Sequence, residues 1–259
     1  MVKSFKTKKS LGQHILRDRN IIRKITDSIP AKYSDLIIEI GPGTGALTEE
    51  LVQNFENITV IEIDQRAVEV LEQKFPGLDI IKQDVLKIDW GPVLKTEKDI
   101  HLIGNLPYNI TSQILFSVMD IRKYLSSVTV MMQKEVADRI IAEPGNKQYG
   151  ILSVQLQLFS NPKILFDVSP NVFIPKPKVD SSVVQFTFGK EELACSDINL
   201  KKVVRTAFNQ RRKKLSNALK TLGIDLPVDE FNFDLRAEAW EPEMYAKLTA
   251  RLEQLDILN

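Results

Sequence analysis

The feature that most constrains the fold is a glycine-rich turn, Gly41-Pro42-Gly43-Thr44-Gly45, which follows the apolar run Leu36-Ile37-Ile38. Residues 46–54 after it have a helical pattern. A strand, a tight turn and a helix in this order let backbone N–H groups approach a ligand closely. The spacing is G-x-G-x-G rather than the G-x-G-x-x-G of dinucleotide-binding proteins, and the proline stiffens the turn. Such a unit is typical of an α/β fold.

The same alternation of strands and helices continues along most of the chain. Strands are expected near residues 36, 58, 78, 100 and 128, and helices near 47, 67, 114 and 136. This alternation predicts a largely parallel sheet covered by helices on both faces. A helix is also expected at 18–28 and another at 153–159, and two further strands at 163–168 and 182–188.

The C-terminal part has a different pattern. Residues 189–199 are polar and irregular, as in a linker, and residues 200–258 show helical patterns without a strand. A chain of 259 residues with 43% hydrophobic residues can form a large domain and a small one. We therefore predict an α/β domain at 1–188 and a small helical domain at 200–259.

Acidic residues follow two of the expected strands. Glu62 and Asp64 come after the strand at 58–61, about twenty positions beyond the glycine-rich turn, where α/β proteins commonly bind ribose hydroxyls. Asp84 follows the strand at 79–82, where its carboxylate could accept a hydrogen bond from an adenine amine. Each acidic residue alone is more often a solvated turn or a helix cap. Together they favour a nucleotide-like ligand.

The segment Asn105-Leu106-Pro107-Tyr108 follows the buried strand expected at 100–104, where open α/β sheets place their ligands. Asn105 offers an amide oxygen, and Pro107 pushes Leu106 toward an extended conformation that can present its carbonyl. Tyr108 offers a flat face on which a base can stack. Two acceptors and one ring suit the exocyclic amine of adenine.

Several motifs together resemble the ribosomal RNA adenine N6,N6-dimethyltransferases, the family whose loss gives kasugamycin resistance. The match runs in order through nearly the whole chain, and it is carried by Ser10 to Leu16, Glu39 to Gly45, Val60 to Asp64, Gly104 to Tyr108, Met132 to Val136, Phe173 to Ser181 and Phe208 to Lys213. The resemblance implies a Rossmann-like, seven-stranded methyltransferase sheet with its last strand antiparallel. It also implies S-adenosylmethionine as cofactor.

The resemblance assigns roles to single positions. His14 and Leu16 would close over the cofactor, Gly41 and Gly43 of the glycine-rich turn would bind it, Glu62 would take the ribose hydroxyls, and Asp84 would bind the cofactor adenine. Asn105 would border both the cofactor and the substrate. Asn105 and the Leu106 carbonyl would orient the target N6 amine, which is a poor nucleophile because its lone pair is delocalised. A flipped adenine would stack on Tyr108, with Phe173 on its other face.

Basic residues are concentrated in two segments, although the net charge is only +1. Residues 1–24 contain eight Lys or Arg and one acid, and residues 201–220 contain eight and no acid. A charge run is usually a solvated helix face. Beside a nucleotide-modifying domain, however, phosphate contact explains it better. We expect Arg211, Arg212, Lys213 and Lys214 to bind the small-subunit ribosomal RNA of an immature particle.

The composition adds further expectations. The single cysteine, Cys195, cannot form an internal disulfide, and His14 and His101 offer neither a metal cluster nor a triad-like arrangement. The chain has no apolar segment of membrane-spanning length and no signal-peptide pattern. A cytoplasmic, monomeric protein without a metal is therefore expected.

Two other functions stay open at this point. The erythromycin-resistance methyltransferases modify one adenine in large-subunit RNA and have a similar Asn-x-Pro-Tyr motif, although Phe208 to Lys213 resembles the small-subunit enzymes more. Alternatively, the protein could be an assembly factor that docks on immature subunits and whose methylation is secondary. The lead hypothesis is dimethylation of two adjacent adenines in a hairpin near the 3′ end of small-subunit RNA, coupled to subunit biogenesis.

Overall fold

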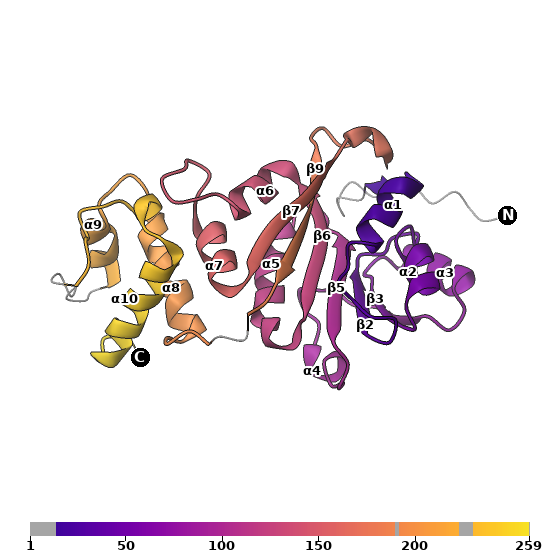
Figure 1. Ribbon diagram of the computed structural model, residues 1–259, viewed down its shortest axis with the longest axis horizontal. Coiled ribbons are helices and arrows are strands. Elements are labelled where there is room, and N and C mark those ends of the chain that lie inside the picture. Colours follow the sequence, from indigo (N-terminus) through magenta and orange to yellow (C-terminus); the bar gives the residue numbers. More distant parts are fainter. Residues whose placement is uncertain (1–13, 190–191, 223–229, 259) are drawn as a thin grey trace. The chain divides into compact units, whose positions relative to one another are not determined.

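The computed structural model describes residues 14–189, 192–222 and 230–258, and its described residues form two compact units (Figure 1). The first comprises Met1–Ala137 and Lys163–Phe188, and the second Asp138–Pro162 and Gly189–Asn259. The boundary differs from the single division predicted at 188, because the segment Asp138–Pro162 groups with the C-terminal helices. The first thirteen residues of the predicted basic N-terminal segment lie outside the described residues.

The first unit contains a seven-stranded mixed sheet with the strand order β4-β3-β2-β5-β6-β9-β7. Strands β2 to β6 run parallel to one another, and β9 runs antiparallel to its neighbour β6. This arrangement confirms the predicted Rossmann-like sheet. The strands of the sheet are β2 (Leu36–Ile40), β3 (Asn57–Ile61), β4 (Asp79–Ile81), β5 (Ile100–Asn105), β6 (Ser127–Gln133), β7 (Asn161–Val168) and β9 (Ser181–Thr187).

The α-helices fall close to the expected positions, and only α4 was not anticipated. The helices are α1 (Arg19–Thr26), α2 (Thr48–Asn54), α3 (Gln65–Lys74), α4 (Trp90–Val93), α5 (Thr111–Asp120), α6 (Lys134–Ile140), α7 (Ile151–Phe159), α8 (Asp197–Asn209), α9 (Leu215–Leu219) and α10 (Pro242–Gln254). The Asp18 side chain caps the start of α1 by accepting from the backbone N–H groups of Asn20 and Ile21.

The strand order places a switch point between β2 and β5. From β2 the chain continues outward through β3 and β4, and it then returns to the other side of β2 to form β5. Ligands of open α/β sheets bind beyond the carboxyl ends of the strands at such a point. Gly104 is required here, because a Cβ atom on it would lie 2.6 Å from the backbone oxygen of Ile40 in β2.

A small second sheet fastens the N-terminal segment to the first unit. β1 (Ile15–Leu16) pairs antiparallel with β8 (Phe173–Ile174), although the two strands are far apart in sequence. Leu16 and Phe173 are opposite each other in this pairing, and both side chains are buried in the core that packs α1 and α2 against the sheet. The pairing therefore holds the backbone after residue 14 at a fixed place.

The second unit is a helical cluster with an aromatic core. Helices α7, α8, α9 and α10 pack together within it. The Tyr149 hydroxyl donates to the Trp240 carbonyl at 2.8 Å, and the Phe208 ring lies between those of Tyr149 and Tyr245, with centroids 6.2 and 6.0 Å away. These contacts explain why α7, which the sequence pattern attached to the sheet domain, belongs to the helical unit.

Candidate active site

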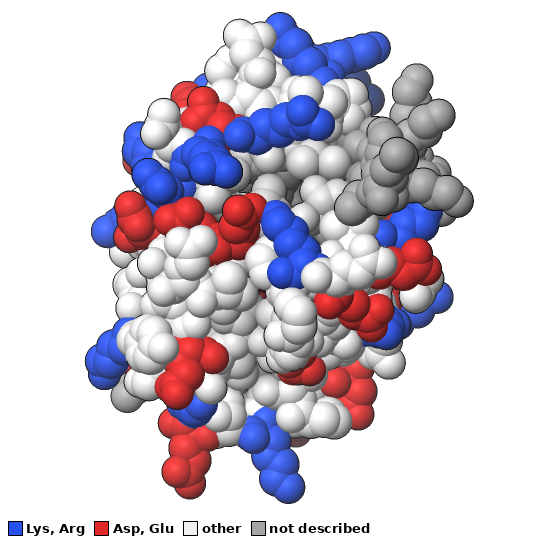
Figure 2. Space-filling view, turned by 90° about the vertical axis from the view of Figure 1, so that its right-hand side faces the viewer, with Lys and Arg blue, Asp and Glu red and all other residues white. Residues whose placement is uncertain are grey.

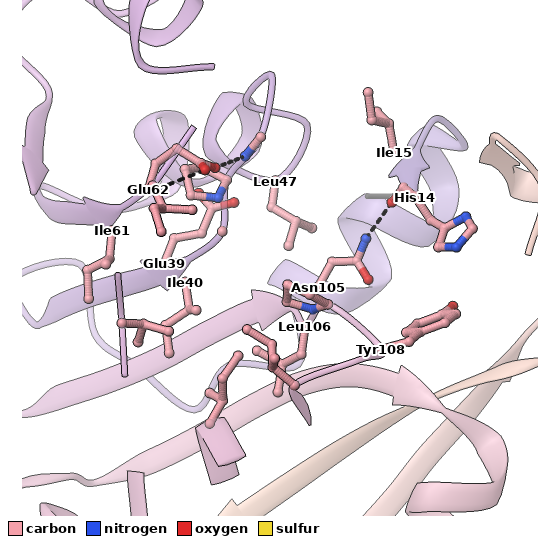
Figure 3. A pocket seen from close by; sticks show the side chains of 18 of the residues that line it. His14, Ile15, Glu39, Ile40, Leu47, Ile61, Glu62, Asn105, Leu106 and Tyr108 are labelled. Carbon is pink, nitrogen blue, oxygen red and sulfur yellow. Dashed lines mark hydrogen bonds between the residues drawn. The ribbon is translucent and has the colours of Figure 1, made fainter. Parts of the chain in front are cut away.

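A cavity of about 270 Å³ lies beyond the carboxyl ends of β2, β3, β4 and β5 (Figure 3). It is lined by all the predicted cofactor and catalytic residues except Phe173, namely His14, Leu16, Gly41, Gly43, Glu62, Asp84, Asn105, Leu106, Pro107 and Tyr108. These residues come from five separate segments of the chain. The switch point therefore assembles one site from the strand ends that the sequence singled out.

The glycine-rich turn leaves room for a ligand against the backbone. Gly41 and Gly43 have φ angles of 67° and 56°, in the left-handed region that favours glycine. A Cβ atom on either residue would meet no protein atom within 4 Å. Because both residues line the cavity, that space belongs to the cavity, and a side chain there would take the volume that a bound molecule needs.

Glu62 joins the glycine-rich turn to the end of β3. Its carboxylate accepts three backbone N–H groups, from Gly43 at 3.0 Å, Ile63 at 2.9 Å and Asp64 at 2.8 Å. The side chain is buried, and burial raises the pKa of this carboxyl group, while the three N–H groups act in the opposite direction. A carboxylate has about four acceptor positions. One position is therefore left for a ligand hydroxyl in this conformation.

Glu39 is a buried carboxyl group in the floor of the cavity, and the sequence analysis gave it no separate role. Its Oε2 atom accepts a hydrogen bond of 2.6 Å from the Thr48 hydroxyl. Burial raises the pKa of Glu39 to about 8; the Thr48 hydrogen bond lowers it and the nearby Glu62 raises it further. The sequence signal was an acid inside the apolar run Leu36–Ile40.

Asp84 is half-buried in the cavity wall, beyond the end of β4. Its Oδ1 atom accepts from the backbone N–H of Leu86 at 3.0 Å, which fixes the loop after the strand. A carboxylate held by one backbone hydrogen bond keeps further acceptor positions for a ligand donor.

The amide group of Asn105 has one defined orientation. Its Nδ2 atom donates to the backbone oxygen of His14 at 2.8 Å. A carbonyl oxygen can only accept, so the amide nitrogen must face His14 and the Oδ1 atom must face away from it. In Figure 3 this oxygen is turned toward the side where the His14 and Tyr108 rings lie. The site therefore presents a fixed acceptor to the cavity.

Tyr108 is held at its hydroxyl group and on one face. Its Oη atom lies 2.6 Å from the Oγ atom of Ser181, and its ring is stacked with the His14 imidazole at a centroid distance of 5.2 Å and an interplanar angle of 29°. Burial raises the pKa of Tyr108, against the effect of the Ser181 hydrogen bond, so the phenol stays neutral. It suits a stacking surface better than a base.

The structure does not support the predicted stacking role of Phe173. This residue does not line the cavity, and its side chain is 2% exposed in the core beneath β1 and β8. The reason is the pairing with Leu16, which the sequence pattern did not reveal. Phe173 instead anchors the segment that carries His14.

Two residues of the predicted basic cluster 211–214 form ion pairs or hydrogen bonds within the protein, and the other two are exposed. Arg211 donates to Glu238 at 2.7 Å and to the Lys147 carbonyl at 2.6 Å, and Lys214 forms an ion pair of 2.9 Å with Asp234. Arg212 and Lys213 are exposed and form no ion pair within the part of the chain that the structure describes. Only two of the four side chains are therefore free to meet phosphates without breaking a contact.

A Ser-His-Asp arrangement occurs at the amino ends of the central strands β2, β5 and β6, which corrects the expectation that no histidine would take part in one. The His101 ring lies 2.8 Å from the Ser127 hydroxyl through Nδ1 and 3.3 Å from an oxygen of Asp35 through Nε2. All three residues are buried, and Ser127 is 0% exposed. A substrate cannot reach this serine, so the arrangement is structural. Burial lowers the pKa of His101.

The described part of the chain has neither a metal-binding cluster nor a membrane-spanning helix. Residues 14–189, 192–222 and 230–258 contain no group of three or more side chains that could hold a metal ion. In the same ranges, no helix has both the length and the apolar character needed to cross a membrane.

Comparison with known proteins points to one family. The family model for "Ribosomal RNA adenine dimethylase" matches residues 4–246. Proteins named "Ribosomal RNA small subunit methyltransferase A" from Chlorobium chlorochromatii and Porphyromonas gingivalis are each 44% identical to the chain. The first match covers 93% of this chain and 92% of the relative, and the second covers 96% and 98%.

Solved structures agree with these matches. A dimethyladenosine transferase from Plasmodium falciparum superposes with a TM-score of 0.79 at 25% identity, over 93% of this chain and 98% of that one. The 23S rRNA methyltransferase ErmE has the same fold, with a TM-score of 0.65 at 24% identity, over 93% of this chain and 100% of its own. The chain belongs to the ribosomal RNA adenine dimethylase family.

Proposed function

We propose that this protein transfers methyl groups from S-adenosylmethionine to the N6 atoms of two adjacent adenines in a hairpin of small-subunit ribosomal RNA. The observation that carries the proposal is the fixed amide of Asn105, whose oxygen faces the cavity beside the Tyr108 ring. The family membership and the names of the 44% identical relatives support the choice of reaction and RNA.

The residues of the cavity fit this cofactor. Gly41 and Gly43 leave open space against the backbone, and Glu62 and Asp84 offer acceptors to ribose hydroxyls and to an adenine amine. The carboxyl groups of Glu39 and Glu62 line the cavity, and a cation bound beside them would favour their ionised forms. When bound, S-adenosylmethionine would supply a methyl group on a positively charged sulfur.

Orientation of the amine supplies the main catalytic effect in this proposal. The lone pair of the adenine N6 atom is delocalised into the ring, which makes the nitrogen a poor nucleophile. Hydrogen bonds from the amine to the Asn105 oxygen and the Leu106 carbonyl favour a pyramidal nitrogen whose lone pair points at the methyl group. Tyr108 holds the base by stacking. A strong base is not required.

Two groups of exposed cations suit the RNA backbone. Arg17, Arg19 and Arg23 line a polar cleft whose wall includes Ile15 and Leu16, which also line the cavity. Figure 2 shows basic side chains over the upper part of the face seen from the side of α1, α2 and α3. Arg212 and Lys213 in the helical unit form the second group. Neutralised phosphates release counterions and supply most of the affinity for RNA.

A second candidate function is that of an assembly factor which docks on immature small subunits and methylates them afterwards. The exposed Arg212 and Lys213 fit this role as well as the catalytic one. A role on large-subunit RNA is less favoured, because the relatives that match over nearly their whole length are named for the small subunit, whereas the similarity to ErmE concerns the fold.

The test is methyl transfer by an Asn105→Ala variant. Undermethylated small subunits are incubated with excess enzyme and labelled cofactor in a single turnover, and the modified adenines are identified by mass spectrometry. The wild type should dimethylate adjacent adenines. The variant should lose most of the rate while it keeps its cofactor affinity, because the interaction strengthens as the nitrogen becomes pyramidal.

The matched control is Asn54→Ala, an exposed asparagine at the end of α2, outside the cavity. It should transfer methyl groups at the wild-type rate. A near-normal rate for Asn105→Ala would remove Asn105 from the catalytic role. Rescue of subunit assembly by the inactive variant would favour the assembly-factor function.

A further inference from the structure

The face of Tyr108 that should receive the target base is already in contact with another ring. The His14 imidazole is stacked on it with a centroid distance of 5.2 Å. Stacked bases repeat at ~3.4 Å, so a base placed between two rings needs a separation of about twice that value. The two side chains as they stand leave no room for an adenine between them.

The orientation of Asn105 selects the side from which the base must approach. Its Oδ1 atom, the acceptor for the target amine, is turned toward the side where both rings lie (Figure 3). A base that stacks on Tyr108 and donates to this oxygen must therefore occupy the space of the imidazole. The requirement rests on the proposed function, since it takes adenine as the substrate.

We propose that the His14 imidazole covers the face of Tyr108 on which the target base stacks, and that base and imidazole exchange places during binding. His14 then selects the base, because the imidazole and the incoming base compete for the same face of Tyr108. A purine that stacks well and donates to Asn105 displaces the ring, and a base that lacks either property does not. This role differs from the contact with the cofactor that the family resemblance assigns to His14.

The surrounding contacts determine which group moves. Tyr108 is held at its hydroxyl by Ser181 at 2.6 Å. The backbone of His14 is held by the bond from Asn105 at 2.8 Å and by the β1–β8 pairing that begins at the next residue. Within the described residues, the imidazole itself has one hydrogen bond, between Nδ1 and the Pro175 carbonyl at 2.7 Å. Rotation of the His14 side chain breaks the bond to Pro175, whereas a shift of its backbone would break the bond from Asn105 and the strand pairing. The rotation leaves Asn105 oriented and Tyr108 bonded to Ser181.

The chain offers a direct spectroscopic test, because it contains only two histidines. In protein labelled with [13Cε1]-histidine, stacking on Tyr108 should shift the His14 signal upfield of its position in a Tyr108→Leu variant. The buried His101 serves as the internal control. We then add S-adenosylhomocysteine and an RNA stem-loop with two adjacent unpaired adenines, and follow binding by the anisotropy of a dye on the RNA.

The proposal expects the His14 signal to move to its position in the Tyr108→Leu variant as the RNA binds, while the His101 signal stays in place. A His14 signal that remains upfield with the RNA bound would overturn it, because the imidazole would then share Tyr108 with the base or the base would use the other face.

Kinetics on undermethylated small subunits supply an independent measurement. At saturating cofactor, His14→Ala should raise kcat/KM for the particle about two- to tenfold, which is the strength of one aromatic pair. His14→Trp should lower it, because the larger ring competes better. The alanine keeps the backbone carbonyl that orients Asn105, and cofactor affinity is measured separately by calorimetry.

The outcomes separate this proposal from the proposed function. A fall in kcat/KM for His14→Ala, with normal cofactor affinity, would mean that the imidazole forms part of the base site, and the exchange would be refuted. Absence of adenine methylation by the wild-type protein would instead refute the proposed function. The histidine signals of the protein with and without Tyr108 would still establish whether the ring is covered.

Discussion

Replacing Glu39 with glutamine should remove a strong pH dependence from the stability of the cofactor-free protein. Burial raises the pKa of this carboxyl group from 4.5 to about 8, so the folded protein keeps a proton that the unfolded chain releases between these two values. The folded state therefore loses stability as the pH rises from 4.5 to about 8. The loss proceeds at ~1.4 kcal/mol per pH unit at most and amounts to ~5 kcal/mol across the whole window.

The glutamine variant cannot ionise, and its side-chain oxygen can still accept the Thr48 hydroxyl. The free energy of unfolding of both proteins is measured by urea titration from about pH 5 to about pH 8, and the difference between them cancels the other titrating groups. We expect Glu39→Gln to gain stability over the wild type steadily across this range. Glu56→Gln, at an exposed position, is the matched control and should show no such gain.

Removal of the Thr48 hydroxyl is a second test of the raised pKa of Glu39. The hydrogen bond from Thr48 lowers the pKa of Glu39, so Thr48→Val should raise that pKa and extend the unstable range to higher pH. A difference between wild type and Glu39→Gln that is independent of pH would refute the argument, because it would mean that the carboxyl group is equally ionised in the folded and unfolded states.

Two further predictions concern the remaining contacts of the site and of the helical unit. Glu62→Gln and Glu62→Ala should both weaken cofactor binding, by ~1.5–3 kcal/mol for the lost charge-assisted hydrogen bond. Both should lower the melting temperature, and the alanine more, because it leaves three backbone N–H groups without their acceptor, whereas the glutamine keeps one oxygen for the donors on one side. Undiminished affinity of the folded glutamine variant in calorimetry would count against the ribose assignment. Arg212 and Lys213 replaced together by glutamine should reduce the slope of log affinity against log salt for small subunits by roughly 0.7–0.9 per lost phosphate contact. Arg211→Gln should instead lower the melting temperature through its lost contacts with Glu238 and Lys147, and an unchanged salt slope in the folded double variant would mean that these cations are a solvated surface.

The sequence by itself determined the order of the elements and the chemistry of the strand ends. The glycine-rich turn, Glu62, Asp84 and the Asn105 segment each follow an apolar run, and the structure puts all of them around one cavity. The physical reason is that strands and helices have apolar residues at a short, regular spacing, which can be read directly from the sequence. In a parallel sheet, the carboxyl ends of neighbouring strands lie at the same edge, so residues after different strands can be expected to meet.

Only the tertiary structure decided the contacts between distant segments. Leu16 pairs with Phe173 between strands of two residues each, which are too short to show an apolar period in the sequence. Because of this pairing, Phe173, which was predicted to stack on the target base, is buried in the core. The same holds for the assignment of α7 to the helical unit and for the burial of Glu39, whose pKa depends on what packs around it. Long-range packing depends on how complementary surfaces fit in space, and a local pattern of residue types does not carry that information.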